Sequence, residues 1–140
     1  VIHMDDFFPP AALRTPARLA EPGGNVHYER FLAEVIAPLS RREEVRYRRF
    51  DCKTMDYAPG LLSAPAGAPV TVEGSYSHHP RFGGYADLRV FLALDKAEQR
   101  RRLRLRESPE SLERFLTRWV PMEDRYFAAC GIPARADLTV

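Results

Sequence analysis

The sequence is poor in lysine and cysteine and has no long apolar run, and each shortage excludes a class of protein. All but two of its 21 basic residues are arginines, and 19 acidic residues leave a net charge of only +2. This balance argues against bulk nucleic-acid binding. The two cysteines, Cys52 and Cys130, have neither a disulfide-framework nor a metal-site spacing. We expect no membrane partner, because no apolar run is long enough to span a bilayer.

The start of the chain lacks the basic segment and apolar core of a signal peptide, so we expect a cytoplasmic protein. A length of 140 residues predicts a single domain over residues 1–140. Short apolar or β-branched runs predict strands at residues 1–4, 70–72, 88–94 and 137–140. Helical spacing of apolar residues predicts helices between them. This alternation predicts an α/β fold with a mainly parallel sheet.

Local signals set several expected boundaries. Asn25 can cap a helix whose apolar face runs from Tyr28 to Leu39. The Pro- and Gly-rich segment 55–69 is expected to be a loop. The nearly continuous apolar run 88–94 is typical of a strand that is buried on both faces.

The last third of the chain carries helix signals. Residues 96–107 predict a basic helix, and Ser108 with Pro109 begins the next one. Pro121 should kink that second helix, because it lacks the backbone donor and clashes with the preceding turn. Gly131 and the proline that follows it should end the helix.

Acidic residues follow two of the predicted strands. Asp5 and Asp6 come after the first strand, and Glu73 comes after residues 70–72. Ligands of open α/β sheets bind at the carboxyl ends of strands, where carboxylates can hold a metal or remove a proton from a hydroxyl. The alternative for Asp5 and Asp6 is that they begin a loop and cap a turn. The alternative for Glu73 is a solvated strand end.

Arginines crowd the basic helix. Arg102 and Arg106 share one face, as do Arg100 and Arg104, so a phosphate chain could be bound there. The alternative is a solvated basic face that nearby glutamates partly neutralise. The histidines His27, His78 and His79 are interpreted as surface or substrate-loop residues, because further zinc ligands are missing.

Several segments, in order along nearly the whole chain, resemble uridine kinase-like P-loop kinases of the bacterial branch. The matching segments are residues 1–8, 28–39, 50–54, 72–77, 88–92 with the Arg helix, and 119–127. The resemblance implies a three-layer P-loop kinase fold with a mainly parallel sheet and an Arg-rich lid at 95–110. The phosphate-cradling motif Gly-x-x-x-x-Gly-Lys-Ser/Thr is missing from the sequence. We expect it, with the first strand, before Val1.

The resemblance also implies roles. Asp5 would accept the hydroxyl proton and help to hold Mg²⁺, Glu73 would orient Mg²⁺ through water, and Arg102 and Arg106 would close over the phosphates of ATP. The acceptor site would be lined by Phe8, Phe50 and Asp51. His27 stands where nucleoside kinases of this family carry a ribose-binding Asp, and Met55 stands near their base-contacting His, so both positions depart from the family's uridine-binding pattern.

The function that this resemblance implies is an ATP-dependent small-molecule kinase. It would transfer the γ-phosphoryl group to a hydroxyl, in the first place the 5′-hydroxyl of uridine or cytidine. The alternatives are another hydroxyl acceptor, such as pantothenate or a sugar, and a nucleotide- or polyanion-binding module without catalysis. The sequence leaves open whether the protein forms a homo-oligomer.

Overall fold

The structure is a computed structural model that describes residues 1–140. The chain packs as two compact units, Val1–Tyr85 and Ala86–Val140, and each has its own strands, helices and buried side chains. The prediction of a single domain stays a prediction.

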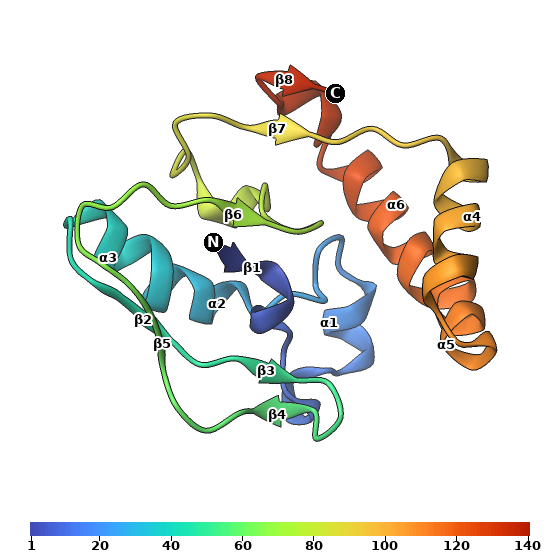
Figure 1. The fold of residues 1–140 in the computed structure, drawn as a ribbon, viewed down its shortest axis with the longest axis horizontal. Helices are drawn as coiled ribbons and strands as arrows, with labels where there is room; N and C mark the ends of the chain where they lie inside the picture. The colour runs from blue at the N-terminus through green and yellow to red at the C-terminus, as the bar shows by residue number, and fades with distance from the viewer. The chain divides into compact units, whose positions relative to one another are not determined.

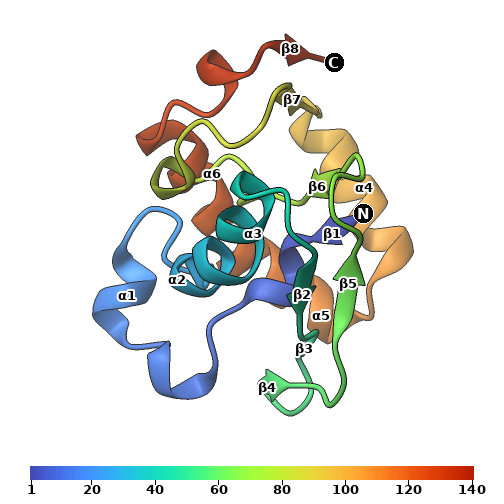
Figure 2. The ribbon, with the colours of Figure 1, turned by 90° about the vertical axis from the view of Figure 1, so that its left-hand side faces the viewer.

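The first unit contains six short strands that form three pairs. They are β1 (Ile2–His3), β2 (Val45–Tyr47), β3 (Phe50–Asp51), β4 (Asp56–Tyr57), β5 (Leu62–Ala64) and β6 (Val72–Glu73). β1 pairs in parallel with β6, which places His3 opposite Glu73 (Figure 1). β2 pairs antiparallel with β5, beside it in Figure 2, and β3 and β4 form a hairpin.

A long helix packs against the strands of the first unit. It consists of α2 (Tyr28–Phe31), a π-helical turn η3 (Leu32–Ile36) and α3 (Ala37–Ser40), as predicted for residues 28–39. Shorter helices are η1 (Met4–Phe7), η2 (Ala11–Leu13), α1 (Pro16–Ala20) and η4 (Pro80–Phe82). The Phe7 ring meets the Phe31 ring edge to face, with centroids 4.9 Å apart, in the centre of the core.

The second unit consists of one parallel strand pair and a helical hairpin. Its elements are β7 (Val90–Phe91), α4 (Lys96–Arg106), α5 (Pro109–Arg114), the π-helical turn η5 (Phe115–Trp119), α6 (Val120–Ala129), η6 (Pro133–Arg135) and β8 (Leu138–Thr139). Phe91 of β7 packs edge to face on Phe127 of α6, with centroids 5.4 Å apart. Lys96 of α4 forms an ion pair with Asp124 of α6, so these helices lie side by side (Figure 1).

Both long helices contain a π-helical turn just before a proline. η3 ends two residues before Pro38, and η5 ends two residues before Pro121. A proline lacks a backbone donor and crowds the carbonyl four residues earlier, and a wider turn relieves that conflict. The kink predicted at Pro121 stays a prediction, and the structure shows a π-helical turn before this proline.

Several predicted helix boundaries are confirmed. The Ser108 side chain accepts a hydrogen bond from the Ser111 backbone N–H at 3.3 Å and caps α5. Gly131, with φ of 59°, ends α6, and the Ile132 N–H donates to the Phe127 carbonyl at 3.0 Å. This pattern is a Schellman motif.

Three local predictions are wrong. Helix α2 is preceded by His27 rather than by Asn25 as its cap residue, because the chain turns through Gly23 and Gly24 and reaches helical geometry later. The segment 55–69 contains β4 and β5 in addition to loop, because both pair with strands that precede it.

The third wrong prediction concerns residues 88–94. Only Val90 and Phe91 form a strand, and Leu88, Leu92 and Leu94 are exposed. The reason is that β7 pairs with a single neighbour, β8, so most of its flanking side chains are left uncovered.

The predicted α/β class is confirmed in part. Helices and parallel strand pairs are both present, whereas no ladder has more than two strands and two of the four ladders are antiparallel. No helix combines the length and the apolar character that crossing a bilayer requires.

Candidate functional site

The turn after β1 separates its two aspartates. Asp5 is exposed, whereas Asp6 is buried beneath the turn. The Asp6 carboxylate lies 3.7 Å from Nε of Arg49, and the Asp6 carbonyl accepts a hydrogen bond from Arg30 at 2.7 Å. Phe7 anchors the other end of η1 in the core. Asp5 is therefore the carboxylate of this pair that faces solvent at the carboxyl end of the strand.

The end of β6 lies directly against this turn. Gly74 has φ of +125°, and a Cβ atom at this position would lie 2.7 Å from Cβ of Met4. Only a glycine fits so close to the neighbouring chain. The preceding residue, Glu73, is exposed, and its carboxylate is hydrogen-bonded to Nδ1 of His3 across the ladder.

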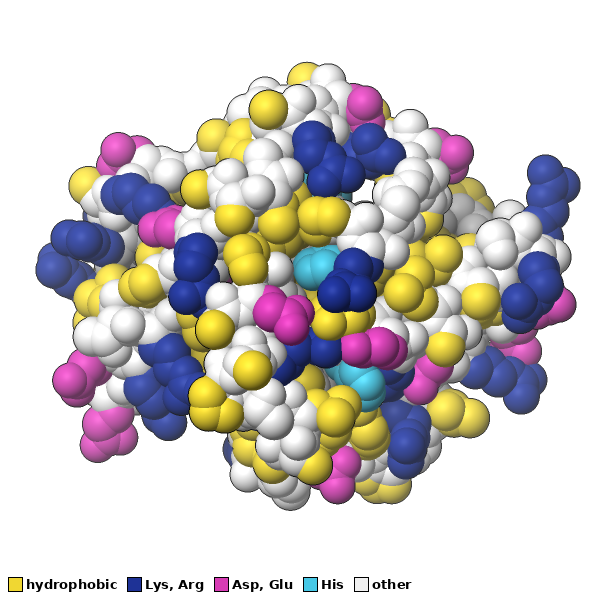
Figure 3. All heavy atoms as spheres, turned by 180° about the vertical axis from the view of Figure 1, so that it is seen from behind, with side chains coloured by type: hydrophobic (Ala, Val, Ile, Leu, Met, Phe, Trp, Pro, Cys, Tyr) yellow, Lys and Arg dark blue, Asp and Glu magenta, His cyan; other side chains and the backbone are white.

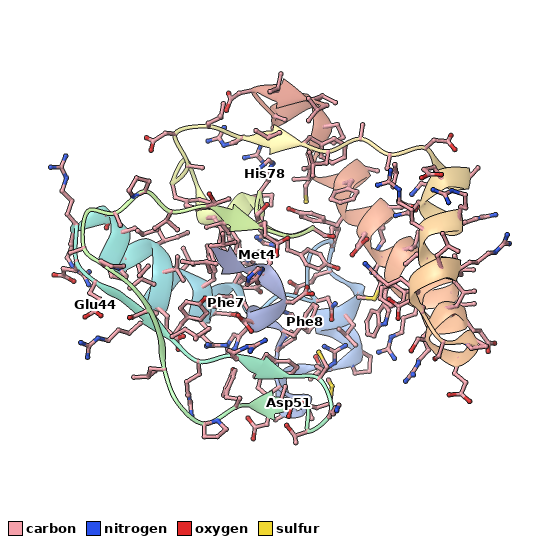
Figure 4. The ribbon with its side chains drawn as sticks, in the orientation of Figure 1. Met4, Phe7, Phe8, Glu44, Asp51 and His78 are labelled. Carbon is pink, nitrogen blue, oxygen red and sulfur yellow. The ribbon has the colours of Figure 1, made fainter.

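Aromatic side chains gather beside η1 (Met4–Phe7), which we call the Asp5 turn. We call Phe8, Phe50 and Tyr57 the aromatic cluster. The Phe8 and Phe50 rings meet edge to face at 6.0 Å, and Phe50 meets Tyr57 at 6.1 Å. Figure 4 shows Phe8 at the end of the Asp5 turn and Asp51 on the β3–β4 hairpin.

Cys52 links this hairpin to the Asp5 turn. Burial raises the pKa of the Cys52 thiol, and the negative charges of Asp5 and Asp51 raise it further. Both carboxylates therefore lie near the same thiol. The sequence-predicted residues Asp5, Phe8, Phe50 and Asp51 thus share one region of the first unit.

His27 joins the same region from the start of α2. Its Nδ1 lies 2.7 Å from the Tyr57 hydroxyl, and the two rings stack at 6.4 Å. Burial lowers the pKa of His27, so the imidazole is neutral at pH 7. A neutral imidazole can both donate and accept a hydrogen bond, which suits recognition of a hydroxyl.

His79 is buried, which corrects its interpretation as a surface residue. It stacks on Tyr28 at 5.2 Å, and its Nδ1 accepts a hydrogen bond from the Arg81 N–H at 3.2 Å. Burial lowers the pKa of His79 to about 4, and the positive charges of Arg81 and Arg18 act in the same direction. His79 is a structural residue that begins η4.

The arginines of α4 fall into two groups, those that form an ion pair with a carboxylate and those that do not. Arg102 donates to Glu98 at 2.7 Å, and Arg106 donates to Glu107 at 2.6 Å. Hydrogen bonds from Arg101 and Arg102 lower the pKa of Glu98 to about 2. Both arginines that we expected to bind phosphates thus contact carboxylates of their own helix or its end.

The other arginine face of α4 lacks such partners. Arg100 and Arg104 form no ion pair, and with Lys96 and Ala97 they line a hollow of about 390 Å³. On the face shown in Figure 3, acidic side chains lie among the Lys and Arg side chains, so the positive charge is dispersed. The net charge of only +2 likewise argues against a surface with charge of one sign.

The chemistry of the donors at the strand ends suits Mg²⁺. Asp5 and Glu73 offer carboxylate oxygens, and Mg²⁺ is usually bound by one or two carboxylates together with substrate phosphates. The structure has no group of three or more His, Cys, Asp or Glu side chains that could hold a metal by themselves.

Sequence reasoning missed two residues of this region, Arg30 and Tyr57. Arg30 is a charged residue in an amphipathic helix, which is ordinarily solvent-exposed. Helical spacing gives no signal for its burial, because Arg30 is outside the set of apolar positions and adjacent residues of a helix point in different directions. Tyr57 falls in the segment that we expected to be a loop.

Comparisons with known proteins support the fold. No protein-family model matches the chain, and no curated protein matches it. Among solved structures, a possible uridine kinase from Bacillus stearothermophilus is similar, with a TM-score of 0.68 and 17% identity. The match covers 99% of this chain and 69% of that protein. The chain therefore shares the overall fold of that protein.

Proposed function

We propose that this chain belongs to an ATP-dependent phosphotransferase that phosphorylates a hydroxyl group of a small molecule. The observation that carries the proposal is the position of Asp5, an exposed carboxylate at the carboxyl end of a parallel strand, beside the aromatic cluster. Ligands of open α/β sheets bind at this end. The structural similarity to a possible uridine kinase supports the same reading.

Asp5 is the proposed base. It is exposed and can approach an acceptor hydroxyl, whereas Asp6 is buried against Arg49 and Arg30. The proton of the acceptor hydroxyl would pass to the Asp5 carboxylate as the hydroxyl oxygen forms its bond to the γ-phosphorus, while the bond from that phosphorus to the bridging oxygen breaks and ADP leaves. Phosphoryl transfer depends mainly on positioning and on charge stabilisation.

Mg²⁺ and ATP would supply the transferred group and its charge neutralisation. Asp5 and Glu73 have suitable oxygen donors for the metal. Glu73 would have to exchange its hydrogen bond with His3 for water or metal, which its exposure permits. The arginines of α4 are the proposed phosphate contacts, Arg102 and Arg106 in the first place.

The proposed acceptor is a nucleoside, with the 5′-hydroxyl of uridine or cytidine as the first candidate. Edge-to-face partners such as Phe8 and Phe50 bind planar rings favourably. His27 and Asp51 can form hydrogen bonds with hydroxyl groups of the acceptor. Pantothenate and sugars are the alternative acceptors within the same chemistry.

A second candidate function is a polyanion-binding module without catalysis. The observation that favours it is the hollow lined by Lys96, Arg100 and Arg104, where two arginines have no carboxylate partner. In that case the full-length protein would bind ATP or polyphosphate without turnover.

The test uses the full-length gene product with MgATP and a panel of uridine, cytidine, pantothenate and a hexose. Phosphorylated acceptor and ADP are both measured. Replacing a general base typically lowers the rate by about 10²–10⁴-fold, so Asp5→Asn should lose most of kcat with an unchanged Tm. Asp6→Asn is the matched control, with a milder effect on kcat.

The results separate the candidates. Turnover that Asp5→Asn abolishes supports the kinase. If Asp6→Asn is the inactive variant, the assignment is wrong by one residue. Nucleotide binding without any phosphorylated product supports the binding module.

A further inference from the structure

Arg30 is a buried cation that contacts three separate parts of the first unit. It is 7% exposed. Its Nη1 donates to the Asp6 carbonyl at 2.7 Å, its Nη2 donates to the Arg48 carbonyl, and its Nε donates to Glu34 at 2.8 Å. All three nitrogens of the guanidinium are therefore engaged at once.

Two aromatic rings flank the same guanidinium. Its Cζ lies 4.7 Å from the centroid of Phe7 and 4.4 Å from that of Tyr57. Phe7 ends the turn that carries Asp5, and Tyr57 belongs to the β3–β4 hairpin. The cation thus lies between a ring of the proposed catalytic turn and a ring of the aromatic cluster.

The contacts join elements that are otherwise far apart in the sequence. The Asp6 carbonyl is part of η1, whereas Arg48 lies two residues before β3. Glu34, one helical turn after Arg30, supplies the negative charge that a buried cation requires. The helix therefore holds the turn and the hairpin at a fixed separation through one side chain.

Only an arginine has the geometry for this arrangement. A guanidinium offers five donors in a rigid plane, whereas a lysine ammonium is a compact point charge on a flexible stem. A lysine at position 30 could retain the charge near Glu34 but could not reach both carbonyls in the same plane.

We propose that Arg30 is a positioning residue that fixes the Asp5 turn relative to the β3–β4 hairpin, so that the base and the acceptor site are aligned. This inference rests on the proposed function. Arg30 acts through these two segments and has no contact with the reacting atoms. Loss of the alignment should affect kcat most, because a displacement of about 1 Å can cost roughly 100-fold in rate.

Arg18 provides a matched control within the same unit. It forms a two-fold hydrogen bond with Glu29 at 2.8 and 2.9 Å, donates to the carbonyls of Gly24 and Val26, and lies over the Tyr28 ring at 3.6 Å. It therefore makes the same kinds of contact as Arg30 but touches neither the Asp5 turn nor the hairpin. A general loss of stability should affect both variants alike.

The experiment compares Arg30→Lys with Arg18→Lys in the full-length protein. Tm, kcat, KM for the acceptor and amide hydrogen exchange are measured for each. We expect Arg30→Lys to lower kcat by at least about 10-fold, to raise KM, and to speed exchange in residues 4–8 and 48–58 together. Arg18→Lys should lower Tm, keep kcat near the wild-type value, and speed exchange only around residues 18–29.

The outcomes distinguish this inference from the proposed function. If the wild-type protein phosphorylates no acceptor, the proposed function fails, and the joint change in exchange still supports or overturns the positioning role. If Arg30→Lys leaves exchange in either segment unchanged, or loses no more kcat than Arg18→Lys, the inference is overturned. If Arg30→Lys does not fold, Glu34→Gln replaces it, because that variant keeps Arg30 and weakens its anchor.

Discussion

The Nδ1 atom of His27 and the hydroxyl oxygen of Tyr57 lie 2.7 Å apart, which joins the start of α2 to the β3–β4 hairpin. Thirty residues separate the two partners in the sequence. The contact fixes the orientation of the His27 ring, and this ring stands at the position where the resemblance places a ribose-binding carboxylate.

The first prediction concerns Tyr57→Phe. This change removes the hydroxyl that orients His27 and keeps the ring that packs on Phe50 and Arg30. Since one hydrogen bond contributes roughly 1 kcal/mol, KM for the acceptor should rise by about 5- to 10-fold with kcat nearly unchanged. Steady-state kinetics with the preferred acceptor check this, with Tyr47→Phe as the control. An equal rise of KM in both variants would refute a specific role.

The second prediction concerns the arginines of α4. Arg102→Ala should lower kcat by about 100-fold if its guanidinium stabilises charge in the transition state. Arg101→Ala is a close control, because Arg101 binds the same Glu98 at 2.6 Å. Activity of Arg100→Ala is measured alongside. A loss in Arg100→Ala with normal activity in Arg102→Ala would move the phosphate contact to the opposite face of the helix.

The third prediction concerns Gly74→Ala. The new Cβ would meet Cβ of Met4 at 2.7 Å, and the backbone would be strained at φ of +125°. We expect a loss of stability of about 2–4 kcal/mol, measured by denaturant unfolding. Gly67→Ala isolates the strain, because φ is +70° there and no atom lies within 4 Å of the added Cβ. Equal losses in the two variants would show that the close approach to Met4 is relaxed in solution.

The fourth prediction concerns stability against pH. Unfolded His79 takes up a proton near pH 6.5, whereas burial delays this in the folded state to about pH 4. The unfolded state therefore binds more protons between these values, so stability is full above pH 6.5 and falls as the pH is lowered toward 4. The loss should reach roughly 3 kcal/mol.

Tm measured from pH 7 to pH 4 in wild type and in His79→Phe checks this. The variant should show a smaller fall, because its ring cannot take up a proton. Arg81 and Arg18 oppose protonation of His79, whereas Glu29 favours it, so the Glu29 charge must be considered. The pKa of Glu29 lies at about 2, well below this window. Parallel Tm curves for the two proteins would contradict the prediction.

The parts of this fold that depend on local chemistry could be predicted from the sequence. Ser108 before Pro109, and Gly131 after a helix, act through neighbouring backbone groups, so their effects could be predicted. The two-residue strand β4 could not, because its formation depends on pairing with β3 and not on any pattern of its own. Likewise, exposure of Leu92 depends on the absence of a second neighbour for β7.

The candidate site likewise has residues that could be predicted from the sequence and residues whose roles depend on distant contacts. A general rule for open sheets predicts a site at the two aspartates after the first strand, whereas the choice of Asp5 and the role of Phe8 come only from the resemblance to the kinase family. The role of Arg30 depends on two carbonyls from distant segments, and backbone carbonyls leave no signal in a sequence. The contact of His27 with Tyr57 was equally hidden.

The π-helical turns before Pro38 and Pro121 also have a consequence for how these helices can change in length. Each turn contains one residue more than an α-helical turn, so it is equivalent to a single-residue insertion within a helix. Deleting one residue from 32–36 would restore regular helical geometry and leave the residues after it facing the same way, because the wide turn absorbs the extra residue. Pro38 would stay buried, but its ring would crowd the carbonyl four residues earlier, so losing the extra residue should destabilise the helix for as long as the proline is present.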